Sequence, residues 1–190
     1  MNKSIRYFAT FFAVTLSTSI SYCGTDLTKS YEAPDANKII EKDITIVGEP
    51  KKFTMPKSCT LDDPLSIERG KYLYMNLNGK SKENPPKGVS RTVKKDGKKV
   101  IKQYGNCVAC HNIEGAIGGG TVGPDLTTYK TNFVDSGARD AQFVYQKIAD
   151  PRIDNPQSFM TINLTTDLFT ESEICDITAF VVAKKDTEKK

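Results

Sequence analysis

The sequence of 190 residues predicts an all-α domain that carries a small β-hairpin as an insertion. Three segments have apolar residues at helical spacing, namely residues 64–77, residues 138–149 and the stretch after Thr170. Between the first two of them, short valine-containing runs at residues 93–100 flank an Asp-Gly pair, which is the signature of a tight hairpin turn. These observations define the predicted fold class.

Local signals place the ends of the three helices. Asp62-Asp63-Pro64 puts a proline at the first helical position behind an acidic cap, and Asn78-Gly79 marks the end of this helix. Asp150-Pro151 stops the second helix, because the residue before a proline avoids the helical conformation. Thr170 and Glu173 have the spacing of a capping box, so the last helix is expected to begin there.

The insertion at residues 80–105 is strongly basic. Between Lys80 and Lys102 the chain has nine basic and two acidic residues, whereas the whole chain has a net charge of only +4. Lysines on both strands of the predicted hairpin would protect its edges from pairing with other chains. The charge indicates either a polarised surface for docking another protein or a solvated basic loop.

The most informative stretch is Cys107-Val108-Ala109-Cys110-His111, which follows the insertion and spells C-x-x-C-H. This is the attachment signature of a c-type haem. Two thiols at this spacing can add to the two vinyl groups of one haem, and the adjacent histidine can bind the iron. A glycine-rich loop at residues 115–123 follows, which suits a backbone that passes close to a flat cofactor.

Two other chemistries use similar cysteine spacings. A structural zinc site needs four ligands, but His111 is the only histidine and the remaining cysteines (Cys23, Cys59 and Cys175) are isolated. A thioredoxin-like pair would open a helix in a βαβ unit, whereas a glycine-rich loop follows the motif here. The sequence therefore favours haem. With no second histidine, the sixth iron ligand is Met, Lys, Tyr, Cys or none.

The N-terminus indicates export. Residues 1–21 resemble a signal peptide, with Lys3 and Arg6 before an apolar segment at residues 7–16 that is too short to span a bilayer. We expect a periplasmic protein, which agrees with haem attachment outside the cytoplasm, and no nucleic-acid partner. Cys23 is either lipidated, which would tether the chain to a membrane, or an ordinary cysteine.

The predicted domain boundaries follow from these signals. Residues 22–61 form a polar, mostly irregular N-terminal extension, in which Ile44, Ile46 and Phe53 can form a short strand or pack on the domain. Residues 62–186 form the domain itself.

The order of helix, C-x-x-C-H motif, loop, helix, irregular stretch and helix resembles the class I cytochrome c fold. The resemblance implies one covalent haem c, attached through Cys107 and Cys110. It implies His111 and Met160 as the two axial ligands of the iron, because Met160 lies in the irregular stretch before the last helix. The alternative for Met160 is a thioether packed in the core.

The same resemblance implies two further contacts. The carbonyl of Pro124 should accept a hydrogen bond from the ring of His111 and so fix the orientation of the imidazole, unless Pro124 is only a turn residue. In this fold the first and last helices cross and pack. Cys59 and Cys175 would then lie close enough for a disulfide in an oxidising compartment, or remain as two buried free thiols.

A narrower resemblance rests on the run from Asp150 to Met160, which reads Asp-Pro-Arg…Asn-Pro-x-x-x-Met and follows a Gly-Pro-Asp-Leu loop at residues 123–126. Together with Gly105-Asn106 before the haem motif, it is similar to the SoxX family, the monohaem cytochrome subunit of the SoxAX complex of bacterial thiosulfate oxidation.

This resemblance implies an enzyme role as the electron-transfer subunit of an L-cysteine S-thiosulfotransferase complex. The implied partners are a SoxA-like haem subunit that holds the reacting thiolate, a carrier protein that bears the substrate cysteine, and a soluble cytochrome c that accepts electrons. Two alternatives are a free-standing periplasmic monohaem electron shuttle and a haem-free binding or structural protein with a chance C-x-x-C-H.

Overall fold

The computed structural model describes residues 48–183. The predicted signal peptide 1–21, Cys23, and the two isoleucines Ile44 and Ile46 lie outside the described residues. Within residues 48–183 no helix is long and apolar enough to cross a membrane.

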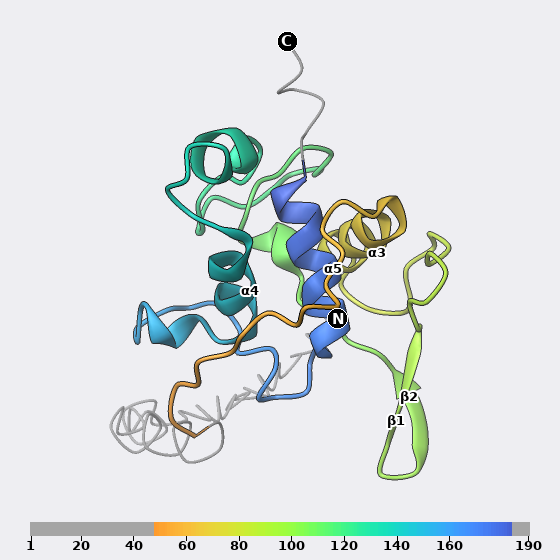
Figure 1. The fold of residues 1–190 in the computed structure, drawn as a ribbon. Coiled ribbons are helices and arrows are strands. Elements are labelled where there is room, and N and C mark those ends of the chain that lie inside the picture. The colour runs from red at the N-terminus through yellow and green to blue at the C-terminus, as the bar shows by residue number, and fades with distance from the viewer. Residues whose placement is uncertain (1–47, 184–190) are drawn as a thin grey trace, which may run out of the picture. The chain divides into compact units, whose positions relative to one another are not determined.

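The described part of the chain is mostly helical, with one small antiparallel sheet (Figure 1). Helix α5 lies between α4 on one side and α3 on the other, and it packs against both (Figure 1). In chain order the elements are α3 (Pro64–Met75), β1 (Thr92–Lys95), β2 (Lys98–Ile101), the 3-10 turn η1 (Cys107–Ala109), the π-helical turn η2 (Lys130–Val134), α4 (Ala141–Ala149), the 3-10 turn η3 (Pro151–Ile153) and α5 (Glu171–Val182).

The predicted helix starts at α3 and α5 are confirmed. The carboxylate of Asp63 accepts hydrogen bonds from the first backbone N–H groups of α3. At α5 the Thr170 hydroxyl accepts from the Glu173 N–H at 3.3 Å, and the Glu173 carboxylate accepts from the Thr170 N–H at 3.0 Å. Both caps satisfy donors that the first turn of a helix leaves without a partner.

Two helix ends differ from the prediction. Helix α3 ends two residues early because Asn76 is extended, with φ −108° and ψ 140°, and its side-chain amide binds the Tyr72 carbonyl at 2.9 Å. Helix α4 begins three residues late because Asp140 caps it, accepting a hydrogen bond from the Phe143 N–H at 2.8 Å. In each case a side chain competes for the terminal backbone groups and fixes the boundary.

A glycine allows α3 and α5 to cross in close contact. A Cβ atom on Gly70 would lie 1.9 Å from the carbonyl oxygen of Asp176 and 2.9 Å from Cβ of Phe180. Next to this contact the rings of Tyr74 and Phe180 meet edge to face, with centroids 5.4 Å apart. The two helices therefore approach backbone to backbone and bury aromatic rings beside the crossing.

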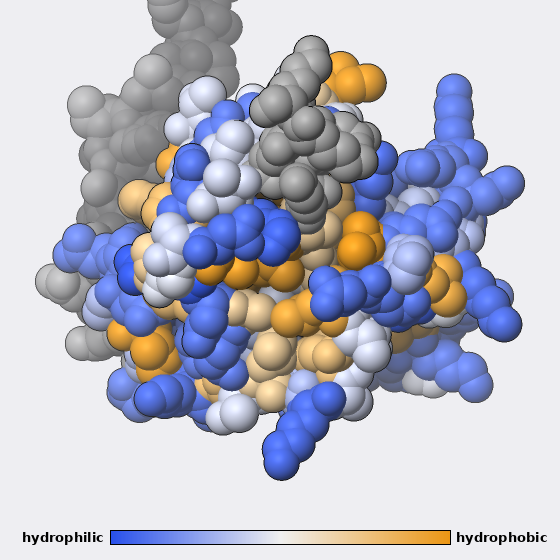
Figure 2. All heavy atoms as spheres, turned by 45° about the horizontal axis from the view of Figure 1, so that its top comes forward, coloured by the Kyte–Doolittle hydropathy of each residue, from blue (hydrophilic) through white to orange (hydrophobic). Residues whose placement is uncertain are grey.

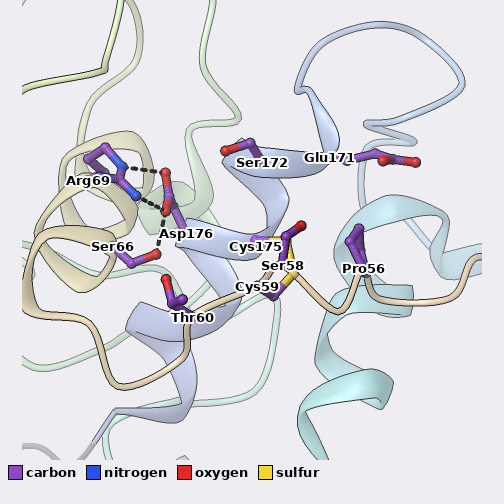
Figure 3. A pocket seen from close by; sticks show the side chains of 10 residues that line it. All are labelled: Pro56, Ser58, Cys59, Thr60, Ser66, Arg69, Glu171, Ser172, Cys175 and Asp176. Atoms are coloured by element: carbon purple, nitrogen blue, oxygen red, sulfur yellow. Dashed lines mark hydrogen bonds and ion pairs between the residues drawn. A yellow bond between two sulfur atoms is a disulfide. The ribbon is translucent and has the colours of Figure 1, made fainter.

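An ion pair also joins the two helices, and a disulfide joins α5 to the segment before α3 (Figure 3). Cys59, just before α3, is bonded to Cys175 of α5 with a Cα–Cα distance of 5.3 Å, which is the pairing that the class I resemblance implies. Arg69 donates two hydrogen bonds of 2.7 Å to the carboxylate of Asp176, which also accepts from the hydroxyl of Ser66. These groups line a small polar cavity of about 200 Å³.

Residues 48–55, which we call the strap, are attached to α4 by side-chain amides. Gln142 accepts from the Met55 N–H at 2.7 Å and donates to the Phe53 carbonyl at 2.9 Å. One turn further, Gln146 accepts from the Phe53 N–H at 2.6 Å and donates to the Lys51 carbonyl at 3.1 Å. Phe53 packs against the core. Two glutamines one helical turn apart on α4 therefore bind the backbone of every second residue of the strap, at residues 51, 53 and 55.

Asp150 and Arg152 continue this attachment. The buried carboxylate of Asp150 accepts from the Lys51 N–H at 3.0 Å and from the guanidinium of Arg152 at 2.9 and 2.8 Å. Arg152 also donates to the Gly48 carbonyl at 2.8 Å. Burial alone would raise the pKa of Asp150, but the hydrogen bonds from Arg152 and from the Lys51 backbone outweigh burial and lower this pKa below its ordinary value.

The predicted hairpin is present. Strands β1 and β2 pair in antiparallel register, with Val93 opposite Val100. Asp96 and Gly97 both have positive φ, at 50° and 74°, which is the conformation that a primed two-residue turn requires. The ribbon extends away from the helices in Figure 1.

Candidate functional site

The haem motif is folded into the tight turn η1 and not into a regular helix. Asn106 precedes η1 in the left-handed conformation, with φ 47° and ψ 43°. The N–H groups of Cys110 and His111 both donate to the carbonyl of Cys107, at 3.1 and 3.0 Å. The three side chains of the motif that can bind haem therefore come from one tight turn, and they differ in how far they are exposed. Cys107 is half-buried, Cys110 is exposed and His111 is buried.

The imidazole of His111 is held by the loop that follows the motif. Its Nδ1 lies 2.9 Å from the carbonyl oxygen of Pro124. A hydrogen bond donated by Nδ1 to this carbonyl leaves Nε2 with its lone pair, which is the form that binds a metal. The backbone at Gly123 lies so close to the ring that a Cβ atom there would be 2.2 Å from Cε1 of His111. Only glycine allows this contact without a shift.

The loop itself is attached to the residues just after the motif. The Gly123 N–H donates to the Cys110 carbonyl at 2.8 Å, and the Leu126 N–H donates to the Asn112 carbonyl at 2.8 Å. The Asn112 amide also donates to the Asp125 carboxylate at 2.7 Å. The orientation of the His111 ring therefore depends on a network that begins in the motif and returns to it.

A cavity of about 380 Å³ opens beside this turn. Cys107, His111, Pro124 and Met160 all line it, although Met160 is 49 residues from His111 in the chain. Most of the remaining lining is apolar and comes from all three long helices and the η2 region, including Tyr74, Leu126, Tyr129, Val144, Ile148 and Ile177. Cys110 is not among the lining residues.

These residues fit a haem c. The volume lies in the range of small-molecule and cofactor sites, and an apolar wall suits a porphyrin. Within residues 48–183 the only free cysteines are Cys107 and Cys110, the two that the motif assigns to haem attachment. His111 and Met160 supply a nitrogen and a thioether sulfur, which are the axial donors of many electron-transfer haems.

The other two chemistries fit less well. Burial raises the pKa of Cys107 to about 12, so this cysteine is not a reactive, low-pKa thiol. In the part of the chain that the structure describes, no group of three or more His, Cys, Asp or Glu side chains is placed to hold a metal ion. The zinc alternative therefore lacks its ligands there.

Two cationic residues of the cavity were not predicted from the sequence. Arg139 and Lys147 both line it, and both lie over the ring of Phe143, at 4.3 and 5.5 Å from its centroid. Haem carries two carboxylate groups, so Arg139 is suited to pair with one of them, whereas Lys147 already forms an ion pair with Asp154 at 3.0 Å. Their charge gave no signal in the sequence, since isolated basic residues on a helix face are normally solvated.

The loops that carry Gly123 and Met160 expose apolar side chains. Ile117, Val122 and Phe159 are 99%, 76% and 96% exposed. Figure 2 shows one face of the molecule, on which hydrophobic residues gather between projecting hydrophilic side chains.

The fold and the site thus define a small helical domain with an apolar cavity beside the C-x-x-C-H turn. A comparison with protein families agrees with this assignment, because the family described as Cytochrome c matches residues 94–184. These residues form a cytochrome c domain, and such a domain implies covalently bound haem c and an electron-transfer function. The match begins in β1 and ends after α5, so it includes neither the strap nor α3. No curated protein matches the chain.

Proposed function

We propose that the domain holds a single haem c as a class I cytochrome c and that it carries one electron at a time. The observation that supports this proposal is the convergence of Cys107, His111, Pro124 and Met160 on one apolar cavity. Haem c would supply the one-electron couple between ferric and ferrous iron. The protein supplies attachment, the two axial donors and exclusion of water.

Each residue has a defined role in this proposal. The thiols of Cys107 and Cys110 would hold the haem, each through a carbon–sulfur bond to one vinyl group, with the thiol proton taken up by the other vinyl carbon. His111, held through Nδ1 by Pro124, offers Nε2 to the iron. The soft thioether of Met160 favours ferrous iron and raises the reduction potential. With His111 and Met160 both as iron ligands, the site would suit electron transfer and not oxygen chemistry.

The role of Met160 can be tested by spectroscopy. The Met160→Ala variant should keep covalent haem but lose the far-red absorption band of a methionine-ligated ferric haem. Met75→Ala is the matched control, because Met75 packs on the core from α3 and does not line the cavity. An M160A protein with an unchanged ferric spectrum would refute methionine ligation.

We further propose that the chain is a SoxX-like subunit of a periplasmic SoxAX complex. The support is the run from Asp150 to Met160, whose two ends have separate tasks in this fold. Asp150 anchors the strap and the start of η3, whereas Met160 lines the cavity. Exposed Ile117, Val122 and Phe159, in the same loops as the site, offer apolar surface for contact with another protein.

In such a complex, thiosulfate is joined to a cysteine of a carrier protein. A sulfur–sulfur bond forms between them, the cysteine thiol loses its proton and two electrons are released. The SoxA-like haem subunit holds the reacting thiolate, so the present chain contributes no sulfur-attacking residue. Its role is to accept the electrons and pass them to a soluble cytochrome c, as the electron-transfer subunit of an L-cysteine S-thiosulfotransferase.

Purification of the native protein after cell fractionation tests this assignment. The SoxX-like role predicts a periplasmic haem protein that co-purifies with a second haem subunit and is reduced when thiosulfate and the carrier are added together. A strictly monomeric cytochrome that thiosulfate does not reduce would support the alternative, a free-standing periplasmic electron shuttle.

A further inference from the structure

We propose that the hairpin β1–β2 (residues 92–101) is a docking arm for a partner protein with an acidic surface, separate from the haem cavity. None of its residues lines that cavity. The proposal goes beyond the electron-transfer function, because a partner held by this arm need not cover the haem site. It does not depend on the SoxX-like assignment.

The base of the arm is firmly fixed to the domain. Arg91 donates its hydrogen bonds to three carbonyl oxygens of the preceding loop, at residues 79–83, with distances of 3.1, 2.6 and 2.7 Å. Lys102, just after β2, forms an ion pair with Glu173 of α5. The hydroxyl of Tyr104 donates to the Ser90 carbonyl at 3.1 Å. The arm therefore projects in one direction and is not a free loop.

The outer part of the arm has a net positive charge, with four lysines against the single acid Asp96. In the observed register Lys94 faces Lys99, and Lys95 faces Lys98. Like charges directly opposite each other destabilise a two-stranded ribbon. All four lysines are exposed, and none of them takes part in an ion pair within the described part of the chain. Carboxylates on a partner would relieve this repulsion.

One face of the arm combines this charge with apolar surface. Val93 and Val100 lie directly opposite each other and are 46% and 38% exposed. Because side chains alternate along a strand, they share a face with Lys95 and Lys98. An apolar centre bordered by charged groups is the arrangement of protein–protein interfaces.

The distribution along the arm favours a protein over a membrane. A hairpin that inserts into lipid needs apolar side chains at its tip, but here the tip is Lys95-Asp96-Gly97-Lys98 and the valines lie nearer the base. Lysines on both strands also oppose the addition of a further strand at either edge. Docking through side chains onto an acidic surface fits both observations.

Binding of the haem-loaded mature protein to poly-L-glutamate tests the arm directly. The arm variant K94Q/K95Q/K98Q/K99Q should bind about tenfold more weakly at low salt, since each exposed ion pair contributes modestly and four are lost. The control variant K51Q/K52Q/K57Q/K71Q removes the same charge from exposed lysines elsewhere. It should lose less than about threefold, because charges far from the contact are largely screened. Haem spectra and thermal unfolding establish that both variants are folded.

Two further measurements identify the class of partner. A copolymer of glutamate and tyrosine should bind more tightly than polyglutamate, and V93T/V100T should remove this advantage. Equal losses in the two lysine variants would overturn the docking arm. Tight binding to phosphatidylglycerol-containing vesicles without binding to either polypeptide would overturn the protein partner in favour of a membrane.

Discussion

Loss of the disulfide between Cys59 and Cys175 should strongly destabilise the domain. The two cysteines are 116 residues apart, so the bond closes most of the described chain into one loop. In the chain-entropy model, a loop of this length lowers the entropy of the unfolded state by about 16 cal/mol/K, or about 5 kcal/mol at 25 °C. We expect the C59A/C175A variant to lose about this much free energy of unfolding, which is a large part of the stability of a small domain.

Guanidinium unfolding of the haem-loaded protein, followed by circular dichroism, measures the loss. Wild-type protein treated with a thiol reductant is the internal control, because the reductant opens the disulfide but leaves the thioether bonds to haem intact. It should unfold at the same midpoint as the double variant. A loss below about 1 kcal/mol, together with alkylation of both thiols in untreated wild-type protein, would show that the bond is absent and the reasoning wrong.

Three further predictions concern the haem site and the strap. Gly123→Ala should displace the ring of His111 and change the haem spectrum, whereas an unchanged spectrum and midpoint would contradict the close contact. Gln146→Ala removes two hydrogen bonds to the strap and should cost about 1–3 kcal/mol, with faster hydrogen exchange at the Phe53 amide; unaltered exchange would show that the strap does not need this side chain. The folded-state pKa of Asp150 is lowered, so its contribution to stability is present above the unfolded pKa of about 3.9 and is lost as the pH falls through the folded value. Asp150→Asn should flatten the acid limb of the stability curve, and an identical limb in both proteins would argue against this linkage.

Local signals explain which parts of the fold could be predicted. The capping residues Asp63 and Thr170 and the turn Asp96-Gly97 act within three residues of themselves, so the sequence alone places two helix starts and the hairpin. The strap could not be predicted in this way. Its hydrogen bonds to Gln142 and Gln146 span about ninety residues of chain, and a glutamine on a helix carries no sign of its distant partner.

The residues of the site also differ in how far the sequence alone predicts them. Cys107, Cys110 and His111 form one contiguous motif with a known chemistry, whereas the roles of Pro124 and Met160 follow only from the resemblance to a known fold. The structure brings Cys107, His111, Pro124 and Met160 to one cavity. The roles of these four residues and of Cys110 as haem attachments, ligands or supports stay predictions. The cations Arg139 and Lys147 were missed, because only the folded helix α4 and its N-terminal turn bring them to the cavity wall.

The attachment of the strap and α3 to α4 and α5 also determines the order in which parts of the domain can fold. Synthesis proceeds from the N-terminus, so residues 48–75 emerge long before the helices that they contact. Until α5 (Glu171–Val182) is complete, these segments lack their partners and the domain cannot close. Contacts between segments this far apart in the chain form late in folding, so the packing of α5 (Glu171–Val182) completes the domain after its other segments are in place.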